Sequence, residues 1–179
     1  MTNPKLTAGG KFPDITLPTL GGGTANLTAT TNDSNWKLIL VYRGKHCPLC
    51  TKQLKELKDY IADFKEAGVD VIAVSGDDKE KATAQLAEIE PNYDVAYDLS
   101  IEQMQSLGLY ISDPRSPQET DHPFAEPALF VVNADGHAQF INIANAPFLR
   151  PDFKSVLSGI GFVRNPDNNY PIRGTRAYA

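Results

Sequence analysis

The chain's two cysteines, Cys47 and Cys50, are the residues whose type and spacing point most directly to chemistry. Pro48 and Leu49 separate them, which makes a Cys-x-x-Cys pair. So short a loop gains little stability from a disulfide, whereas it suits a dithiol that is oxidised and reduced in turn. The pair follows a strand-like apolar run and opens an amphipathic run. The N-terminus of a helix favours a thiolate, so the setting predicts redox chemistry.

Basic residues immediately precede the pair: Arg43, Lys45 and His46. Nearby positive charge lowers the pKa of a thiol, so we expect these residues to activate one of the cysteines. Pro48 is suited to the first turn of a helix. The pattern predicts that one accessible cysteine attacks a peroxide oxygen or a substrate sulfur and that the other resolves the product.

Two other interpretations of the pair remain open. A structural zinc site needs four ligands, and the three histidines, His46, His122 and His137, do not recur at ligand spacing. We therefore expect no metal and no cofactor, and we expect His122 and His137 to be loop and turn residues. The pair could also be inert core cysteines, although the proline and the polar flanks argue against burial.

Apolar periodicity predicts an α/β domain in which strands and helices alternate along the chain. Segment 112–127 contains four prolines and is predicted to be a loop. We expect one domain over residues 1–163 and an extended tail over 164–179. The strands are predicted at residues 12–17, 24–27, 38–42, 69–75, 95–99, 128–132 and 137–143, and the helices at 48–68, 77–89, 101–107 and 152–160.

Asp77, with Glu80 three residues later, resembles a capping box at the start of the second predicted helix. We therefore interpret Asp77 and Asp78 as helix-capping residues and not as a carboxylate pair for acid–base catalysis.

Composition and charge narrow the class of protein. The chain has 179 residues, of which 41% are hydrophobic and 22% charged, as in a globular domain. Its net charge is -5 and no basic stripe is visible, so we expect no nucleic-acid partner. No apolar run approaches the ~20 residues of a membrane span. The first residues lack the apolar core of a signal peptide, which predicts a cytoplasmic protein with reduced thiols.

Four segments of the chain carry a family likeness: residues 10–17, 41–50, 71–75 and 127–136. With them, residues 9–160 resemble the peroxiredoxin-like branch of the thioredoxin fold, the alkyl hydroperoxide reductase and thiol-specific antioxidant family. The resemblance implies a thioredoxin-like fold, with a mixed β-sheet flanked by helices and an N-terminal β-hairpin extension. It also implies an antioxidant oxidoreductase.

The chain departs from the peroxiredoxin pattern at its active site. In the resemblance, the peroxidatic cysteine falls on Cys50 and the preceding threonine on Cys47. The family's proline falls on Arg43, and its later arginine falls on Pro127. The threonine and arginine that orient a peroxide in that family are therefore missing from their usual places.

Each replacement matches what a thioredoxin carries. On that pattern Cys47 is the exposed attacking thiol and Cys50 the resolving thiol. Pro127 then corresponds to the thioredoxin cis-proline, which implies a cis Glu126–Pro127 bond.

The resemblance therefore implies a thiol-dependent oxidoreductase that reduces hydroperoxides through a Cys47/Cys50 dithiol–disulfide cycle. The alternatives are a thioredoxin-like protein disulfide reductase and a redox-sensing binding module without turnover. The expected partners are a hydroperoxide or disulfide substrate and a thiol reductant such as a thioredoxin or glutathione system. A homodimer is a further option, because many relatives of this type dimerise. The candidate supporting residues are Arg43, His46, Pro48 and Pro127. Arg43, or an arginine from elsewhere in the chain such as Arg115 or Arg150, could take the place of the missing arginine.

Overall fold

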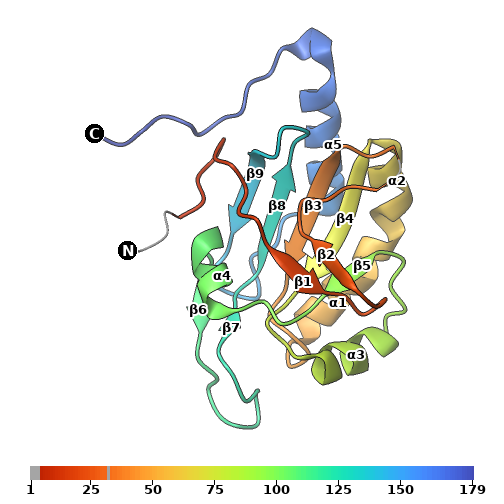
Figure 1. Cartoon of the computed structure of the whole chain (residues 1–179), viewed down its shortest axis with the longest axis vertical. Coiled ribbons are helices and arrows are strands. Elements are labelled where there is room, and N and C mark those ends of the chain that lie inside the picture. The colour runs from red at the N-terminus through yellow and green to blue at the C-terminus, as the bar shows by residue number, and fades with distance from the viewer. Residues whose placement is uncertain (1–4, 32) are drawn as a thin grey trace.

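The computed structural model describes residues 5–31 and 33–179. A five-stranded mixed sheet forms the centre of the molecule, in the order β5-β4-β3-β8-β9 (Figure 1). Strands β3, β4 and β5 are parallel, and β8 runs antiparallel to both β3 and β9. The strands are β3 (Trp36–Val41), β4 (Val69–Val74), β5 (Asp94–Ala96), β8 (Ala128–Val132) and β9 (Ala138–Ile143).

The two faces of this sheet are covered by different elements. Side chains alternate along a strand, so Leu38 and Leu40 of β3 pack on one face and Ile39 and Val41 on the other. The hairpin of β1 (Thr16–Pro18) and β2 (Thr24–Asn26), together with α4 (Ile101–Leu107), covers the second face. Four helices cover the first face: α1 (Pro48–Leu57), α2 (Ile61–Glu66), α3 (Lys79–Ala87) and α5 (Phe153–Arg164). The predicted α/β fold with an N-terminal hairpin is confirmed.

The predicted long helix over residues 48–68 is interrupted. Between α1 and α2 the chain tightens into a 3-10 turn, η1 (Lys58–Tyr60). The Lys58 carbonyl accepts a hydrogen bond from the Asn92 side chain at 3.2 Å, and the Lys58 ammonium donates to the Ile89 carbonyl at 2.8 Å. These contacts with the segment after α3 compete with regular helical bonding at this point.

The proline-rich segment predicted to be a loop contains a short ladder at its ends. Strand β6 (Ile111–Ser112) pairs with β7 (Phe124–Ala125) in antiparallel fashion. The backbone N–H of Glu126 continues this pairing by donating to the Tyr110 carbonyl at 2.8 Å. Pro114, Pro117 and Pro123 all lie between the two strands, where no ladder donor is needed.

The cap of α3 lies one residue later than the sequence pattern predicts. The Asp78 side chain accepts from the Lys81 backbone N–H at 2.9 Å and caps the helix. Asp77 is fully buried, because the turn after β4 directs its carboxylate inwards. The expectation that Asp77 is a helix cap is therefore wrong.

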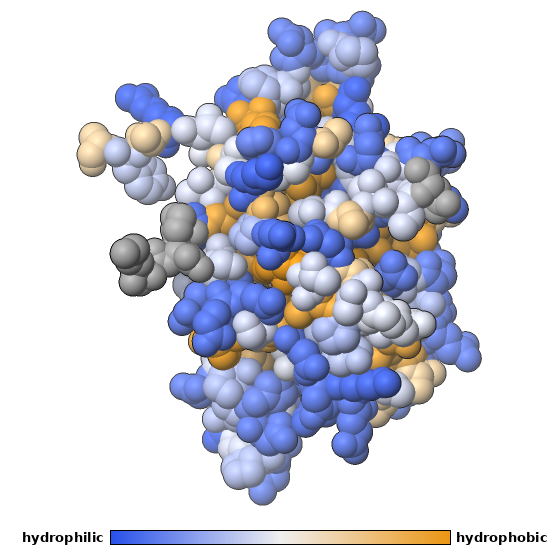
Figure 2. Space-filling model, viewed as in Figure 1, coloured by the Kyte–Doolittle hydropathy of each residue, from blue (hydrophilic) through white to orange (hydrophobic). Residues whose placement is uncertain are grey.

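Beyond α5 the chain forms a single 3-10 turn, η2 (Pro166–Asn168), and then returns in an extended form toward the N-terminal segment, where residues 174–178 and 5–8 line a common pocket with β9 (Figure 1). The division into a domain over 1–163 and a tail stays a prediction. No helix in the described part of the chain has the length and apolar character needed to cross a membrane. Apolar residues on the face seen in Figure 2 lie in separate patches among charged ones.

Candidate active site

The cysteine pair lies where β3 gives way to α1, at the carboxyl end of a central strand. Cys47 is the N-cap of α1, and its sulfur accepts the backbone N–H of Cys50 at 3.3 Å. Pro48 occupies the first helical position, where a backbone N–H would lack an intrahelical partner. The first turn of α1 therefore holds both sulfurs on the side of the helix that faces the sheet.

Both thiols are buried and unbridged, with 1% of Cys47 and none of Cys50 exposed. The expectation of an accessible attacking thiol is wrong for this state of the protein. The exposed residues of the motif are Pro48 and Leu49, whereas the cysteines belong to the core under α1. Since α1 is amphipathic, positions three apart share its inner side, and this places Cys47 and Cys50 there together.

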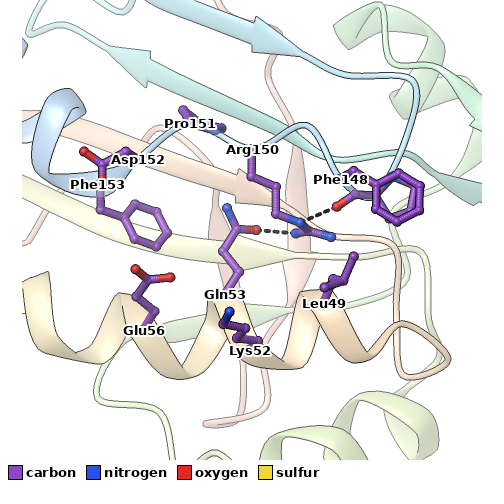
Figure 3. Close-up of a pocket in the computed structure, with 10 residues that line it drawn as sticks. Leu49, Lys52, Gln53, Glu56, Phe148, Arg150, Pro151, Asp152 and Phe153 are labelled. Atoms are coloured by element: carbon purple, nitrogen blue, oxygen red, sulfur yellow. Dashed lines mark hydrogen bonds between the residues drawn. The ribbon is translucent and has the colours of Figure 1, made fainter.

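Arg150, from the loop between β9 and α5, reaches both sulfur atoms. Its Nη2 lies 3.2 Å from the Cys50 sulfur and 3.7 Å from the Cys47 sulfur. The same guanidinium donates from Nε to the Pro147 carbonyl at 2.6 Å and from Nη1 to the Gln53 side chain (Figure 3). Four partners fix the group, so Arg150 holds a positive charge beside both sulfurs.

Arg115, the other candidate, does not approach the cysteines. Its side chain is 87% exposed and pairs with Glu119 four residues later. Arg150 is about 100 residues from the pair in sequence, and periodicity carries no signal for where an irregular loop returns. The sequence therefore offered both arginines without a means of choosing between them.

Arg43 approaches the pair through its backbone and its side chain. Its N–H donates to the Cys50 sulfur at 3.3 Å, and the positive charge of its guanidinium helps to lower the pKa of Cys47. Its Nε also lies 2.9 Å from Glu126 Oε2, and its guanidinium carbon lies 4.8 Å from the centre of the Phe124 ring. Burial of this ion pair fixes the guanidinium beside the dithiol.

His46 is close to the pair but carries no positive charge at neutral pH. Burial and the charge of Arg43 lower its pKa to about 4. Its ring lies 4.3 Å from the Phe124 ring, and neither ring nitrogen has a hydrogen-bond partner among the described residues. The expectation that His46 adds positive charge is therefore wrong, and its imidazole packs as an aromatic ring.

The interaction between the two thiols separates their acidities. The pKa of Cys47 is lowered to about 5, chiefly because the Cys50 thiol donates to it, with help from Arg43 and the Cys50 N–H. The pKa of Cys50 is raised, mainly by burial and by the negative charge of Cys47, while Arg150 opposes the rise. The pair therefore loses its first proton readily, from Cys47, and its second with difficulty.

Pro127 begins the turn into β8, and no peptide bond in the described ranges is cis. The implied cis Glu126–Pro127 bond is therefore wrong. The Glu126 backbone is bonded to Tyr110, and its side chain accepts from Ser112 and pairs with Arg43. These partners fix Glu126 in the β6–β7 ladder, so the thioredoxin cis-proline has no counterpart here.

Two cavities lie on either side of Pro147 and Phe148, above the dithiol. One of about 390 Å³ includes Arg150 and Gln53 in its lining, with Leu49 and Phe148 at its end (Figure 3). The other, of about 380 Å³, includes Arg43 and Glu126. Each cavity is thus lined by one of the two arginines that lie near the dithiol. Over the described residues, no group of three or more His, Cys, Asp or Glu side chains could hold a metal ion.

Comparisons with known proteins place the chain among relatives. The chain is 28% identical over 138 residues to peroxiredoxin Bcp of Escherichia coli, a match that covers 76% of this chain and 85% of that protein. It is 27% identical over 139 residues to a 1-Cys peroxiredoxin of Medicago truncatula, covering 74% of this chain and 62% of that one. Two relatives from Mycobacterium tuberculosis are each 35% identical to this chain over 79 residues. The match covers 48% of each relative, so the chain spans about half of their length.

Solved structures share the fold. A cysteine-to-serine variant of peroxiredoxin 6 of Arenicola marina superimposes with a TM-score of 0.76 at 20% identity, over 90% of this chain and 75% of that one. A peroxiredoxin-like protein from Aquifex aeolicus gives 0.71 at 19% identity, over 89% and 88%. The sequence model of the AhpC/TSA family matches residues 8–141. The chain therefore belongs to the AhpC/TSA family.

Proposed function

We propose that the protein is a thiol-dependent peroxidase of the peroxiredoxin type, which reduces hydroperoxides through Cys47 and Cys50. One observation carries this proposal: the Arg150 guanidinium lies within hydrogen-bonding distance of both sulfurs, and backbone N–H groups of Cys50 and Arg43 point at them. Such donors stabilise the thiolate that attacks and the negative charge that develops on the leaving oxygen. Family membership supports the same reaction.

The proposed cycle begins with the Cys47 thiolate, whose pKa of about 5 keeps it charged at neutral pH. Its sulfur attacks the terminal peroxide oxygen, the O–O bond breaks, and the alkoxide leaves as an alcohol after taking a proton. Cys47 is then a sulfenic acid. The Cys50 sulfur attacks it, water leaves, and an intramolecular disulfide forms. This order reverses the one that the peroxiredoxin pattern implies, because the acidity of Cys47 and its place at the helix N-cap support it as the first nucleophile.

An external dithiol of the thioredoxin or glutathione type would return the disulfide to two thiols. We place the protein in the cytoplasm, where such reductants keep paired thiols reduced. Large apolar side chains are exposed around the site: Leu49 by 37%, Phe148 by 79% and Leu149 by 56%. This rim supports contact with a protein, so a protein disulfide is the second candidate substrate.

Steady-state peroxide consumption with a thioredoxin system tests the proposal, with wild type, Cys47→Ser and Cys50→Ser compared. We expect turnover in wild type only. In a single turnover without reductant, Cys50→Ser should still consume one equivalent of peroxide, and Cys47→Ser should consume little. Faster consumption by Cys47→Ser would reverse the order of attack.

The same proteins separate the other functions. Insulin reduction without peroxide turnover would favour the protein disulfide reductase. Loss of two thiols to stoichiometric peroxide, with no turnover by any reductant, would favour the redox-sensing module. Wild-type thiols that survive excess peroxide would contradict both the peroxidase and the redox-sensing module, and the absence of insulin reduction would contradict the protein disulfide reductase.

A further inference from the structure

Asp77 is a buried carboxylate that the proposed cycle does not use. It follows β4, and none of its surface is exposed. Burial raises its pKa, and the Lys45 N–H, His122 and Lys81 oppose that rise. A buried charge is costly unless its surroundings satisfy it, so the contacts of this carboxylate indicate what it does.

Those contacts lead to the turn that carries Cys47. Asp77 Oδ2 accepts the backbone N–H of Lys45 at 2.7 Å. Gly44 has φ of +140°, and a Cβ built there would lie 2.8 Å from both carboxylate oxygens. The backbone of the turn therefore approaches the carboxylate as closely as only glycine permits.

The Gly44–Lys45 turn also determines where α1 begins. The Gly44 carbonyl accepts the backbone N–H of Cys47 at 3.2 Å and the Gln85 side-chain amide at 3.1 Å. Cys47 is the N-cap, so its sulfur meets the Cys50 N–H only if this turn keeps its shape. A chain of contacts thus runs from the Asp77 carboxylate, through the Gly44–Lys45 backbone, to the Cys47 sulfur.

The opposite oxygen of the carboxylate is held by a different segment. Asp77 Oδ1 lies 3.3 Å from Nε2 of His122, whose other ring nitrogen lies 2.9 Å from Asp121. Asp121 pairs with Lys81 of α3, which also pairs with Asp78. Tyr42 and Lys45 are the other titratable residues beside Asp77. The carboxylate is therefore fixed from both sides.

We propose that Asp77 is a positioning residue for Cys47, acting through the Gly44–Lys45 turn that its carboxylate shapes. The inference rests on the proposed function in naming Cys47 as the attacking thiol. Asp77 contacts neither sulfur, so its effect is exerted through the backbone, which keeps Cys47 among its N–H and guanidinium donors.

The direction in which removal of Asp77 shifts the pKa of Cys47 separates a positioning role from a purely electrostatic one and from a purely structural one. If Asp77 acted only as a nearby negative charge, its removal would lower the pKa of Cys47. If it only stabilised the fold, removal would leave that pKa unchanged. If it positions Cys47, removal costs the sulfur its donors and raises the pKa.

The experiment measures alkylation by iodoacetamide against pH in the reduced full-length protein. Asp77→Ala should raise the midpoint by about two pKa units from its wild-type value of about 5, which slows alkylation at pH 6 about tenfold. Asp77→Asn keeps an acceptor for the Lys45 N–H, so its profile should match wild type within about twofold. Asp78→Ala removes the neighbouring exposed helix cap and is the matched control, which should lower thermal stability without moving the midpoint.

An Asp77→Ala midpoint equal to that of Asp78→Ala, or shifted downward, would overturn the proposal. If Asp77→Ala does not fold, Asp77→Ser replaces it, because a serine hydroxyl is too short to reach the turn. Alkylation needs no peroxide turnover, so failure of the proposed peroxidase activity and failure of this inference remain distinguishable.

Discussion

Arg150 is the residue on which reactivity should depend most among those that do not form the disulfide. Its guanidinium touches both sulfurs, and a hydrogen bond to a charged group contributes about 1.5–3 kcal/mol. Arg150→Ala should therefore slow the second-order reaction with hydrogen peroxide roughly 10- to 100-fold, as measured by stopped flow. Arg115→Ala is the matched control, since that arginine is exposed and pairs only with Glu119 in the described structure. Equal rates for the two variants would contradict the role given to Arg150.

The acidity of Cys47 predicts how stability depends on pH. Its pKa is about 5 in the folded protein, below its value in an unfolded chain, so the unfolded state binds more protons between pH 5 and ~8.5. The free energy of unfolding should rise across this window, by at most about 1.4 kcal/mol per pH unit, and the gain is lost as pH falls through 5. The raised pKa of Cys50 has the opposite effect at higher pH.

Urea denaturation of the reduced protein at pH 5, 7 and 8.5 checks this slope. Other groups also titrate, so the informative quantity is the difference in the free energy of unfolding between wild type and Cys47→Ser. That difference should grow with pH over the window. A difference that stays constant would mean that Cys47 is not a thiolate in the folded state.

At the scale of elements, the β6–β7 ladder and the cysteine loop meet in one buried ion pair. Glu126 pairs with Arg43 and accepts from Ser112, and its side chain is 5% exposed. Glu126→Gln leaves the Arg43 charge without its closest partner, so we expect a loss of about 2 kcal/mol in the free energy of unfolding. Urea titration measures it. Glu102→Gln, at an exposed position on α4, should change stability by less than about 0.5 kcal/mol.

Elements with strong periodicity were predictable, and their contacts were not. Continuous apolar runs predict β3, β4 and β8, and the helical spacing of Leu54 and Leu57 predicts α1. Such elements can be predicted because the residues that each buries recur at a regular local spacing. The break at η1 depends on Asn92, which lies 34 residues away from Lys58. A tertiary hydrogen bond of this kind leaves no periodic signal.

The site shows the same division between local and distant information. Cys47, Cys50 and Pro48 could be placed at the start of a helix because their roles depend on adjacent residues. The local pattern around Asp77 predicts a helix cap, because its true partner, the Lys45 N–H, lies in the loop between β3 and α1 and is distant in sequence. Polar flanks also suggested exposure of the thiols, whereas burial is set by Arg150 and its loop, which the linear pattern does not position.

At the scale of the whole molecule, the enclosed dithiol should discriminate between reagents by size. Both sulfurs are buried beneath Arg150 and the Pro147–Phe148 segment. A small peroxide should therefore oxidise the folded protein quickly, while the bulky aromatic disulfide DTNB should react at least tenfold more slowly with it than with the urea-unfolded chain. Colourimetric stopped flow gives both rates. Phe148→Ala should increase the DTNB rate, and Phe162→Ala, an exposed phenylalanine on α5, should not.

Because both sulfurs share the first turn of α1 and the same Arg150 nitrogen, a sulfenic acid formed at Cys47 has its resolving thiol close by. Further oxidation to the sulfinic acid requires a second oxidant molecule to enter while that intermediate persists. Formation of the Cys47–Cys50 disulfide inside a covered pocket should be faster than the reaction of the sulfenic acid with a second oxidant molecule. The protein should therefore withstand oxidant bursts that inactivate enzymes whose resolving cysteine must travel, and a serine at position 50 should remove this protection.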